Sequence, residues 1–114
     1  MPYLKIQTNI EREPGDSQPV LARASKLVAE LLGKPEKYVM VALETAVPLA
    51  LGGSEAPAAY LELKSIGLPH DKTTELSQAL CELIHDEFGV NPERVYIEFA
   101  DAPRTMWGWN GGTF

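Results

Sequence analysis

The sequence is poor in the residues that build disulfides and metal centres. Its 114 residues include one cysteine, Cys81, and two histidines, so an internal disulfide and a cysteine-based metal cluster are both excluded. His70 and His85 lie fifteen positions apart in one predicted helical segment, a spacing that does not suit a shared metal ion. We therefore expect no metal, no cofactor and no disulfide-reductase activity of the paired-cysteine type.

Positive charge and long apolar runs are also scarce. The chain has 10 Lys and Arg against 16 Asp and Glu, a formal net charge of -6 and no basic cluster, so nucleic acid is not an expected partner. No apolar run approaches the roughly 20 residues of a membrane-spanning helix. Lys5 and Gln7 interrupt the apolar start, so no signal peptide is expected. These absences predict a cytoplasmic protein without membrane contact, and leave open secretion by a route that needs no signal peptide.

One pattern of strand, amphipathic helix, glycine and strand occurs twice in the chain. The first unit, about 1–47, and the second, about 58–101, belong to a single domain covering 1–114. The expected elements are strands at 3–8, 38–43, 60–64 and 95–99, a helix capped by Ser17 and ended by Gly33, and a helix from about His70 to Phe88. Each unit reads as a βαβ motif with parallel strands. We therefore predict an α+β fold with a four-stranded sheet and two helices on one face.

The two faces of the predicted sheet differ in polarity. One face, beneath the helices, is apolar and carries Leu4, Ile6, Val39, Val41, Leu61, Leu63, Val95, Ile97 and Phe99. The other is half apolar and carries Tyr3, Lys5, Tyr38, Met40, Tyr60, Glu62, Lys64, Tyr96 and Glu98. Exposed apolar area of this kind commonly meets another chain. We favour self-association, while a partly solvated face with scattered tyrosines stays open.

Pro2 stands directly before the first strand. If the initiator methionine is removed, Pro2 becomes a free secondary amine held by that strand. An α-amino group has a reference pKa of about 7.7–8.0, and burial or a nearby cation lowers it. Such an amine acts as a base at neutral pH. Many chains have proline at this position without any catalytic role, so Pro2 alone does not establish one.

Short blocks along the whole chain carry a resemblance. They are Met1-Pro2, Thr8-Asn9, Gly33-Lys34-Pro35 with Tyr38, Gly52-Gly53-Ser54, Ser65-Ile66-Gly67, Arg94-Val95-Tyr96-Ile97, and Gly108-Trp109-Asn110 with Thr113-Phe114. In order and spacing they resemble the macrophage migration inhibitory factor and D-dopachrome tautomerase family of the tautomerase superfamily. The resemblance implies a homotrimer whose three sheets surround a channel, with active sites at subunit boundaries. It also implies an isomerase that interconverts keto and enol forms of a small aromatic α-keto acid such as phenylpyruvate.

The resemblance also implies roles for individual residues. Pro2 matches the catalytic proline and Lys34 the active-site lysine, although a lysine just beyond a helix often only complements the helix dipole. A lysine near the amine would depress its pKa and could bind a carboxylate or an enolate oxygen. Ser65 and Ile66 match a pair whose backbone N–H groups can hold a carboxylate.

The resemblance further places three aromatic residues in the walls of the pocket. They are Tyr38, Tyr96 and Trp109; each alternatively packs at a subunit contact. Two residues depart from the family. Glu98 replaces a common asparagine and cannot donate a hydrogen bond when ionised, and Trp107 replaces a smaller residue and would narrow the pocket.

Two other functions remain open at this point. One is a cytokine-like binding or signalling protein with little catalysis and a receptor that the sequence does not identify. The other is a different proline-dependent reaction, such as hydrolytic dehalogenation or decarboxylation. Because Pro2 and Lys34 are both present, the sequence favours the tautomerase.

Overall fold

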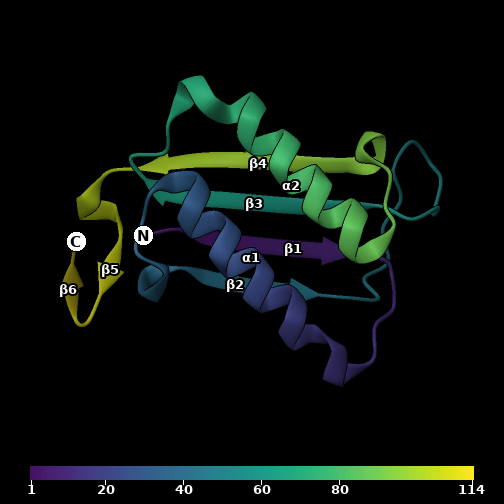
Figure 1. Cartoon of the computed structure of the whole chain (residues 1–114). Coiled ribbons are helices and arrows are strands. Elements are labelled where there is room, and N and C mark those ends of the chain that lie inside the picture. Colours follow the sequence, from purple (N-terminus) through teal and green to yellow (C-terminus); the bar gives the residue numbers. More distant parts are fainter.

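Two helices cover one face of a four-stranded sheet (Figure 1). The structure is a computed structural model that describes residues 1–114. Its main elements are β1 (Tyr3–Thr8), α1 (Ser17–Leu32), β2 (Met40–Glu44), β3 (Ala59–Ile66), α2 (Thr73–Phe88) and β4 (Val95–Ala102). This architecture confirms the predicted fold class. Neither helix combines the length and apolar character that a membrane-spanning helix needs.

The sheet consists of two pairs of parallel strands whose inner strands are hydrogen-bonded to each other. Its strand order is β2-β1-β3-β4, with β1 parallel to β2 and β3 parallel to β4. The two pairs meet in the middle, where β1 runs antiparallel to β3. Each βαβ unit of the sequence is therefore one half of the sheet, and the strand that begins the chain is a central one.

The apolar sheet face and the inner faces of both helices form the core. Leu4, Ile6, Leu61 and Leu63 on the two central strands have no solvent-exposed surface. The helices contribute Val20, Ala24 and Val28 from α1 and Leu76, Leu80, Leu83, Ile84 and Phe88 from α2. Burying one such aliphatic side chain is worth about 1.5–3 kcal/mol. The predicted core residues of β2 and β4 pack against this cluster but are mostly half-buried, because their strands form the edges of the sheet.

Glycine ends each helix and turns the chain back toward the sheet. Gly33 has φ +62° and Gly89 has φ +70°, a left-handed conformation that glycine adopts without steric cost. Beyond Gly33, the Lys34 N–H donates to the Ala29 carbonyl at 3.0 Å. This is the hydrogen bond of a Schellman motif that spans the larger number of residues. This turn fixes Lys34 at the end of α1 from which the chain enters β2.

The second strand begins later than predicted. Tyr38 is not a strand residue but ends a 3₁₀ turn, Glu36–Tyr38, whose bonds run from the Tyr38 N–H to the Pro35 carbonyl at 3.1 Å and from Val39 to Glu36 at 2.9 Å. Proline has a fixed φ suited to the start of such a turn. Tyr38 therefore stands at the end of the sheet and not on its open face.

Both helix starts also differ from prediction. Ser17 is the first residue of α1 and not its cap, because a 3₁₀ turn at Pro14–Asp16 leads directly into the helix. Likewise, a 3₁₀ turn at His70–Lys72 precedes α2, which begins at Thr73. A backbone hydrogen bond closes each turn, from Asp16 to Glu13 at 2.9 Å and from Lys72 to Pro69 at 3.2 Å, and no side chain caps either helix.

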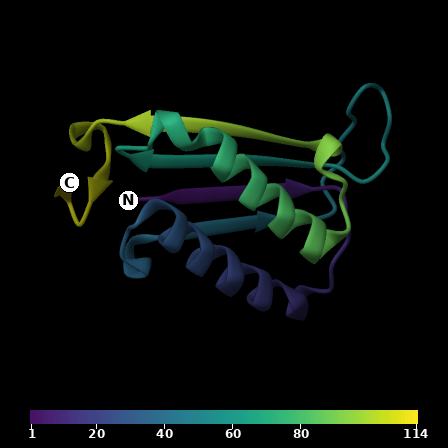
Figure 2. The same ribbon diagram turned by 45° about the horizontal axis from the view of Figure 1, so that its top comes forward.

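A short hairpin follows the sheet. Its strands are β5 (Gly108–Trp109) and β6 (Gly112–Thr113), which pair only with each other. Asn110 and Gly111 form the turn with φ +53° and +76°, as expected for an Asn-Gly hairpin. Figures 1 and 2 both show this hairpin at the same end of the sheet as the N-terminus.

The loop between β2 and β3 lies at the opposite end of the sheet (Figures 1 and 2). Arg94 holds it: Nε donates to the Pro57 carbonyl at 2.9 Å, and Nη2 to the Ser54 and Ala56 carbonyls at 3.0 Å each. The Asn9 amide also donates to Ala56, at 3.1 Å. Arg94 and Asn9, both in blocks that carry the family resemblance, thus act in folding this loop.

Candidate active site

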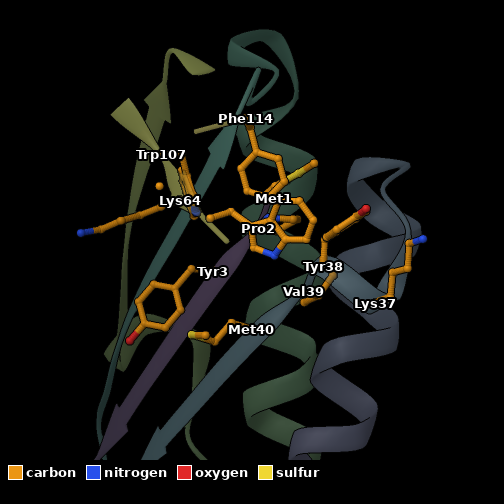
Figure 3. A pocket seen from close by; sticks show the side chains of 12 residues that line it. Met1, Pro2, Tyr3, Lys37, Tyr38, Val39, Met40, Lys64, Trp107 and Phe114 are labelled. Carbon is orange, nitrogen blue, oxygen red and sulfur yellow. The ribbon is translucent and has the colours of Figure 1, made fainter. Parts of the chain in front are cut away.

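A cavity of about 500 Å³ opens at the N-terminal end of the sheet (Figure 3). Eight of its 12 lining residues are hydrophobic, and none is Asp or Glu. They come from the N-terminus (Met1, Pro2, Tyr3), the turn before β2 (Lys37, Tyr38, Val39, Met40), β3 (Lys64) and the tail (Trp107, Gly108, Trp109, Phe114). Its size is typical of a small-molecule site.

Pro2 is fixed in the middle of this cavity. It is buried, and its carbonyl accepts a hydrogen bond from the Met40 N–H at 3.0 Å. The next residue, Tyr3, pairs with Met40 on β2 and with Lys64 on β3. Figure 3 shows Met1 and Pro2 between Tyr38 on one side and Lys64 and Trp107 on the other. Because β1 is a central strand, the end of the chain is held from both sides.

The environment of the terminal amine favours its neutral form. Burial lowers the pKa of the Met1 amine from 8.0, and the charges of Lys34 and Arg104 lower it further. Lys34 does not line the cavity, but its charge lowers the pKa of the Met1 amine. Arg104 was not predicted, because it lies in a tail without periodic pattern and belongs to no recognised motif.

Aromatic rings from distant parts of the chain form one wall. Trp109 stacks on Phe114 with ring centroids 5.1 Å apart and planes at 14°. Tyr38 meets both rings edge to face, with its centroid 5.8 Å from each. The Phe114 N–H donates to the Trp107 carbonyl at 3.2 Å. Tyr38, Trp107 and Trp109 thus line the cavity, and Phe114 is a wall residue that the sequence analysis had not placed there.

Ser65 and Ile66 lie beside the N-terminus but do not line the cavity. Both are buried at the end of β3, immediately after Lys64, which pairs with Tyr3. The Ser65 hydroxyl donates to the Ile66 carbonyl at 3.1 Å. Within one chain their side chains are therefore packed inside the fold.

Tyr96 and Glu98 lie away from the cavity of their own chain. Both are exposed on β4, and the register aligns Glu98 with Glu62 and, through it, with Lys5 on β1. Lys5, the β1 residue of this row, lies three positions after Pro2, and Glu98 lies two strands away from β1 in the sheet. A single chain consequently brings together Pro2, Tyr38, Trp107 and Trp109, with Lys34 in electrostatic range, and leaves Tyr96 and Glu98 apart.

The cavity contains groups that are suited to acid–base chemistry. No three His, Cys, Asp or Glu side chains come together in a way that could hold a metal ion. The cavity combines an amine of lowered pKa, cations and an aromatic wall. Such a site can hold a flat anionic ligand and remove a proton from it.

Comparison with known proteins gives matches over the whole chain. The family model described as macrophage migration inhibitory factor (MIF) matches residues 1–114. A macrophage migration inhibitory factor homolog of Brugia malayi is 40% identical over 115 residues, covering 100% of this chain and 99% of that protein. The crystal structure of a homologue from Prochlorococcus marinus has a TM-score of 0.93 and 42% identity, covering 98% of each chain. The structure from Trichinella spiralis has a TM-score of 0.90 and 34% identity, covering 98% of this chain and 99% of that one.

Proposed function

Because the chain belongs to the macrophage migration inhibitory factor family, in the tautomerase superfamily, we propose that it is a keto–enol tautomerase with Pro2 as its base. The observation that carries the proposal is the position of Pro2, buried in an aromatic-walled cavity where burial and two cations lower the pKa of the terminal amine. A lowered pKa increases the unprotonated fraction of such an amine at a given pH, and a general base acts in its unprotonated form.

Removal of Met1 would transfer the amine to Pro2. Consecutive Cα atoms are about 3.8 Å apart, so the new amine would lie deeper in the same cavity and within reach of the same cations. Burial and the charges of Lys34 and Arg104 are therefore expected to lower its pKa as well. Proline is suited to this task because its ring restricts the terminal amine to few orientations.

The reaction is a transfer of one proton. The unprotonated Pro2 amine takes a proton from the carbon next to the ketone of an aromatic α-keto acid, which leaves an enolate. The protonated amine then delivers the proton to the enolate oxygen and yields the enol; the reverse path regenerates the ketone. Lys34 would stabilise the enolate or the carboxylate, and the aromatic wall would hold the ring. The backbone N–H groups at Ser65 and Ile66, which do not line the cavity of one chain, would bind the carboxylate only if the assembled site opens to them.

We also propose that the working site needs a second copy of the chain. The open sheet face carries large apolar side chains, with Met40 67% and Tyr96 64% exposed, and such area favours association. In a homotrimer with sites at subunit boundaries, Tyr96 and Glu98 of one copy would complete the cavity of the next. This assembly accounts for two predicted site residues that lie outside the cavity of their own chain.

The test is the replacement of Pro2 by glycine. Pro2→Gly keeps a terminal amine but removes the ring and the secondary-amine character, and should lower kcat/KM for ketonisation of enol phenylpyruvate by about 10² or more. Mass spectrometry must show removal of Met1 in both proteins. A control with one alanine inserted before Pro2 should be similarly inactive, because the proline nitrogen becomes an amide.

Unchanged turnover in Pro2→Gly would remove the proline from the mechanism. Absence of turnover in the correctly processed wild type would reject phenylpyruvate-type tautomerisation altogether. A binding or signalling protein would then be the better description of this chain. The search for its partners would start from the name of its relatives, macrophage migration inhibitory factor.

A further inference from the structure

Four cations surround the cavity although the chain is acidic overall. Lys37 and Lys64 line it, and the charges of Lys34 and Arg104 reach the amine at its centre. The whole chain has only 10 Lys and Arg and a net charge of -6, yet four of those cations lie here and no carboxylate lines the cavity. Four of the ten basic residues thus lie at or near one site that no carboxylate lines.

These four cations form no ion pair or side-chain hydrogen bond within the chain, in contrast to three of its other basic residues. Arg12 and Arg23 form ion pairs with acidic residues at the end of α2, and Arg94 donates to the carbonyls of the loop between β2 and β3. None of the four cavity cations takes part in an ion pair. Their charge is thus available to a ligand.

The four cations form two pairs that differ in their distance from the centre of the cavity. Lys34 and Arg104 act on the amine at the centre of the cavity. Lys37 and Lys64 lie on opposite sides of it, and Figure 3 shows their ammonium ends pointing away from Met1 and Pro2, at the outer edge, or rim, of the cavity. Lys37 Nζ lies 5.1 Å from the centre of the Tyr38 ring, so the rim charge adjoins the aromatic wall. A ligand with one carboxylate at the amine would leave the rim cations without a partner.

We infer that the cavity prefers an aromatic keto acid with a second anionic group at the end remote from the keto acid, and that Lys37 and Lys64 set this preference. The inference rests on the proposed function for the reacting end, whereas the charge preference belongs to the cavity itself. A cavity of about 500 Å³ has room for a ring with an acid at each end. If a neighbouring copy contributes Glu98, it offsets one positive charge and leaves three.

The first experiment measures binding without chemistry. The probes are 3-phenylpropionate, with one carboxylate, and 3-(4-carboxyphenyl)propionate, with two, titrated into the processed wild-type protein by calorimetry at low and at physiological salt. An exposed ion pair contributes roughly 1.5- to 5-fold in affinity. Because Lys37 and Lys64 lie on opposite sides of the cavity, the added carboxylate pairs with one of them at a time and should favour the dianion by about this factor. The preference should shrink with added salt, because exposed charges are screened.

Substitutions of Lys37 and Lys64 test whether these two lysines cause the preference for the dianionic probe. Lys37→Gln combined with Lys64→Gln should bring the affinity ratio close to one while binding of the monoanion is largely kept. Lys26→Gln is the matched control, since Lys26 is an exposed lysine on α1 outside this cavity, and it should leave the ratio unchanged. Circular dichroism and sedimentation of each variant establish that fold and assembly are retained.

Turnover separates this inference from the proposed function. Phenylpyruvate and 4-carboxyphenylpyruvate are compared, and the second should have the higher kcat/KM. Equal affinity for the two propionate probes, or a preference that survives the double variant, overturns the inference even if both keto acids react. Preferred binding of the dianionic probe without turnover of either keto acid supports the inference and rejects the tautomerase.

Discussion

The aromatic wall should control substrate affinity without controlling global stability. Trp109→Ala removes two ring pairs, the stack on Phe114 at 5.1 Å and the edge-to-face contact with Tyr38 at 5.8 Å. Each aromatic pair is worth about 0.5–1.5 kcal/mol beyond its burial, so the change should weaken attachment of the tail by about 1–3 kcal/mol. Trp109 is 51% exposed, so its burial adds comparatively little.

That loss should appear as local opening. The hairpin β5–β6 pairs only with itself and not with the four-stranded sheet, so it can detach while the core stays folded. A change of about 1–3 kcal/mol raises the open population roughly 5- to 150-fold. The free energy of global unfolding should fall by less than about 0.5 kcal/mol, whereas KM for the keto acid should rise strongly.

Hydrogen exchange and denaturation together test this reasoning. The Phe114 N–H, bonded to the Trp107 carbonyl at 3.2 Å, should exchange faster in Trp109→Ala, while amides of the core strands keep their protection. Trp109→Phe retains a ring for stacking and should show a smaller effect on both exchange and KM. A large loss of global stability with unchanged exchange at Phe114 would refute the description of the tail as a separately held wall.

Three further predictions concern assembly and pH. Sedimentation at micromolar concentration should give a homotrimer; a stable monomer would contradict the role given to the open sheet face. The pKa of Asp101 is lowered, first by its bond to His70 at 2.9 Å and also by the Leu68 N–H. Ionised Asp101 therefore stabilises the fold above the unfolded carboxyl pKa of about 3.9, and this stabilisation is lost as the pH falls through the lowered pKa of the folded state. Asp101→Asn should be less stable than wild type above about pH 4, and the two proteins should become equally stable in stronger acid. If Glu98 of a neighbouring copy lies beside Pro2, its charge raises the pKa of the amine; Glu98→Asn should lower that pKa and extend activity to lower pH, and an unmoved acid limb of kcat/KM would place Glu98 away from the amine.

Much of the fold could be predicted because its determinants are local. The alternation along residues 3–8 appears directly as alternating burial in β1, and Gly33 and Gly89 end the two helices as expected. Strand boundaries were less predictable at Tyr38, where alternation continues across a 3₁₀ turn that Pro35 starts. A two-residue period alone does not distinguish the last residues of a turn from the first of a strand.

The site was only partly predictable because its residues converge from unrelated segments. Pro2, Tyr38, Trp107 and Trp109, which the sequence analysis named, line the cavity. Arg104 and Phe114 come from the tail, which has no hydrophobic period and whose position depends on ring contacts with Tyr38. No local pattern encodes those contacts.

The position of both chain ends has a practical consequence for handling the protein. Met1 and Phe114 both border the cavity, so a purification tag or fusion partner on either end would have to pass its mouth, and one at the N-terminus would also convert the proposed catalytic amine into an amide. The loop before α1 is a better place for a label, because Glu13, Pro14 and Gly15 are exposed and follow the far end of β1 (Figure 1). An affinity tag inserted there leaves both ends of the chain as the site requires them.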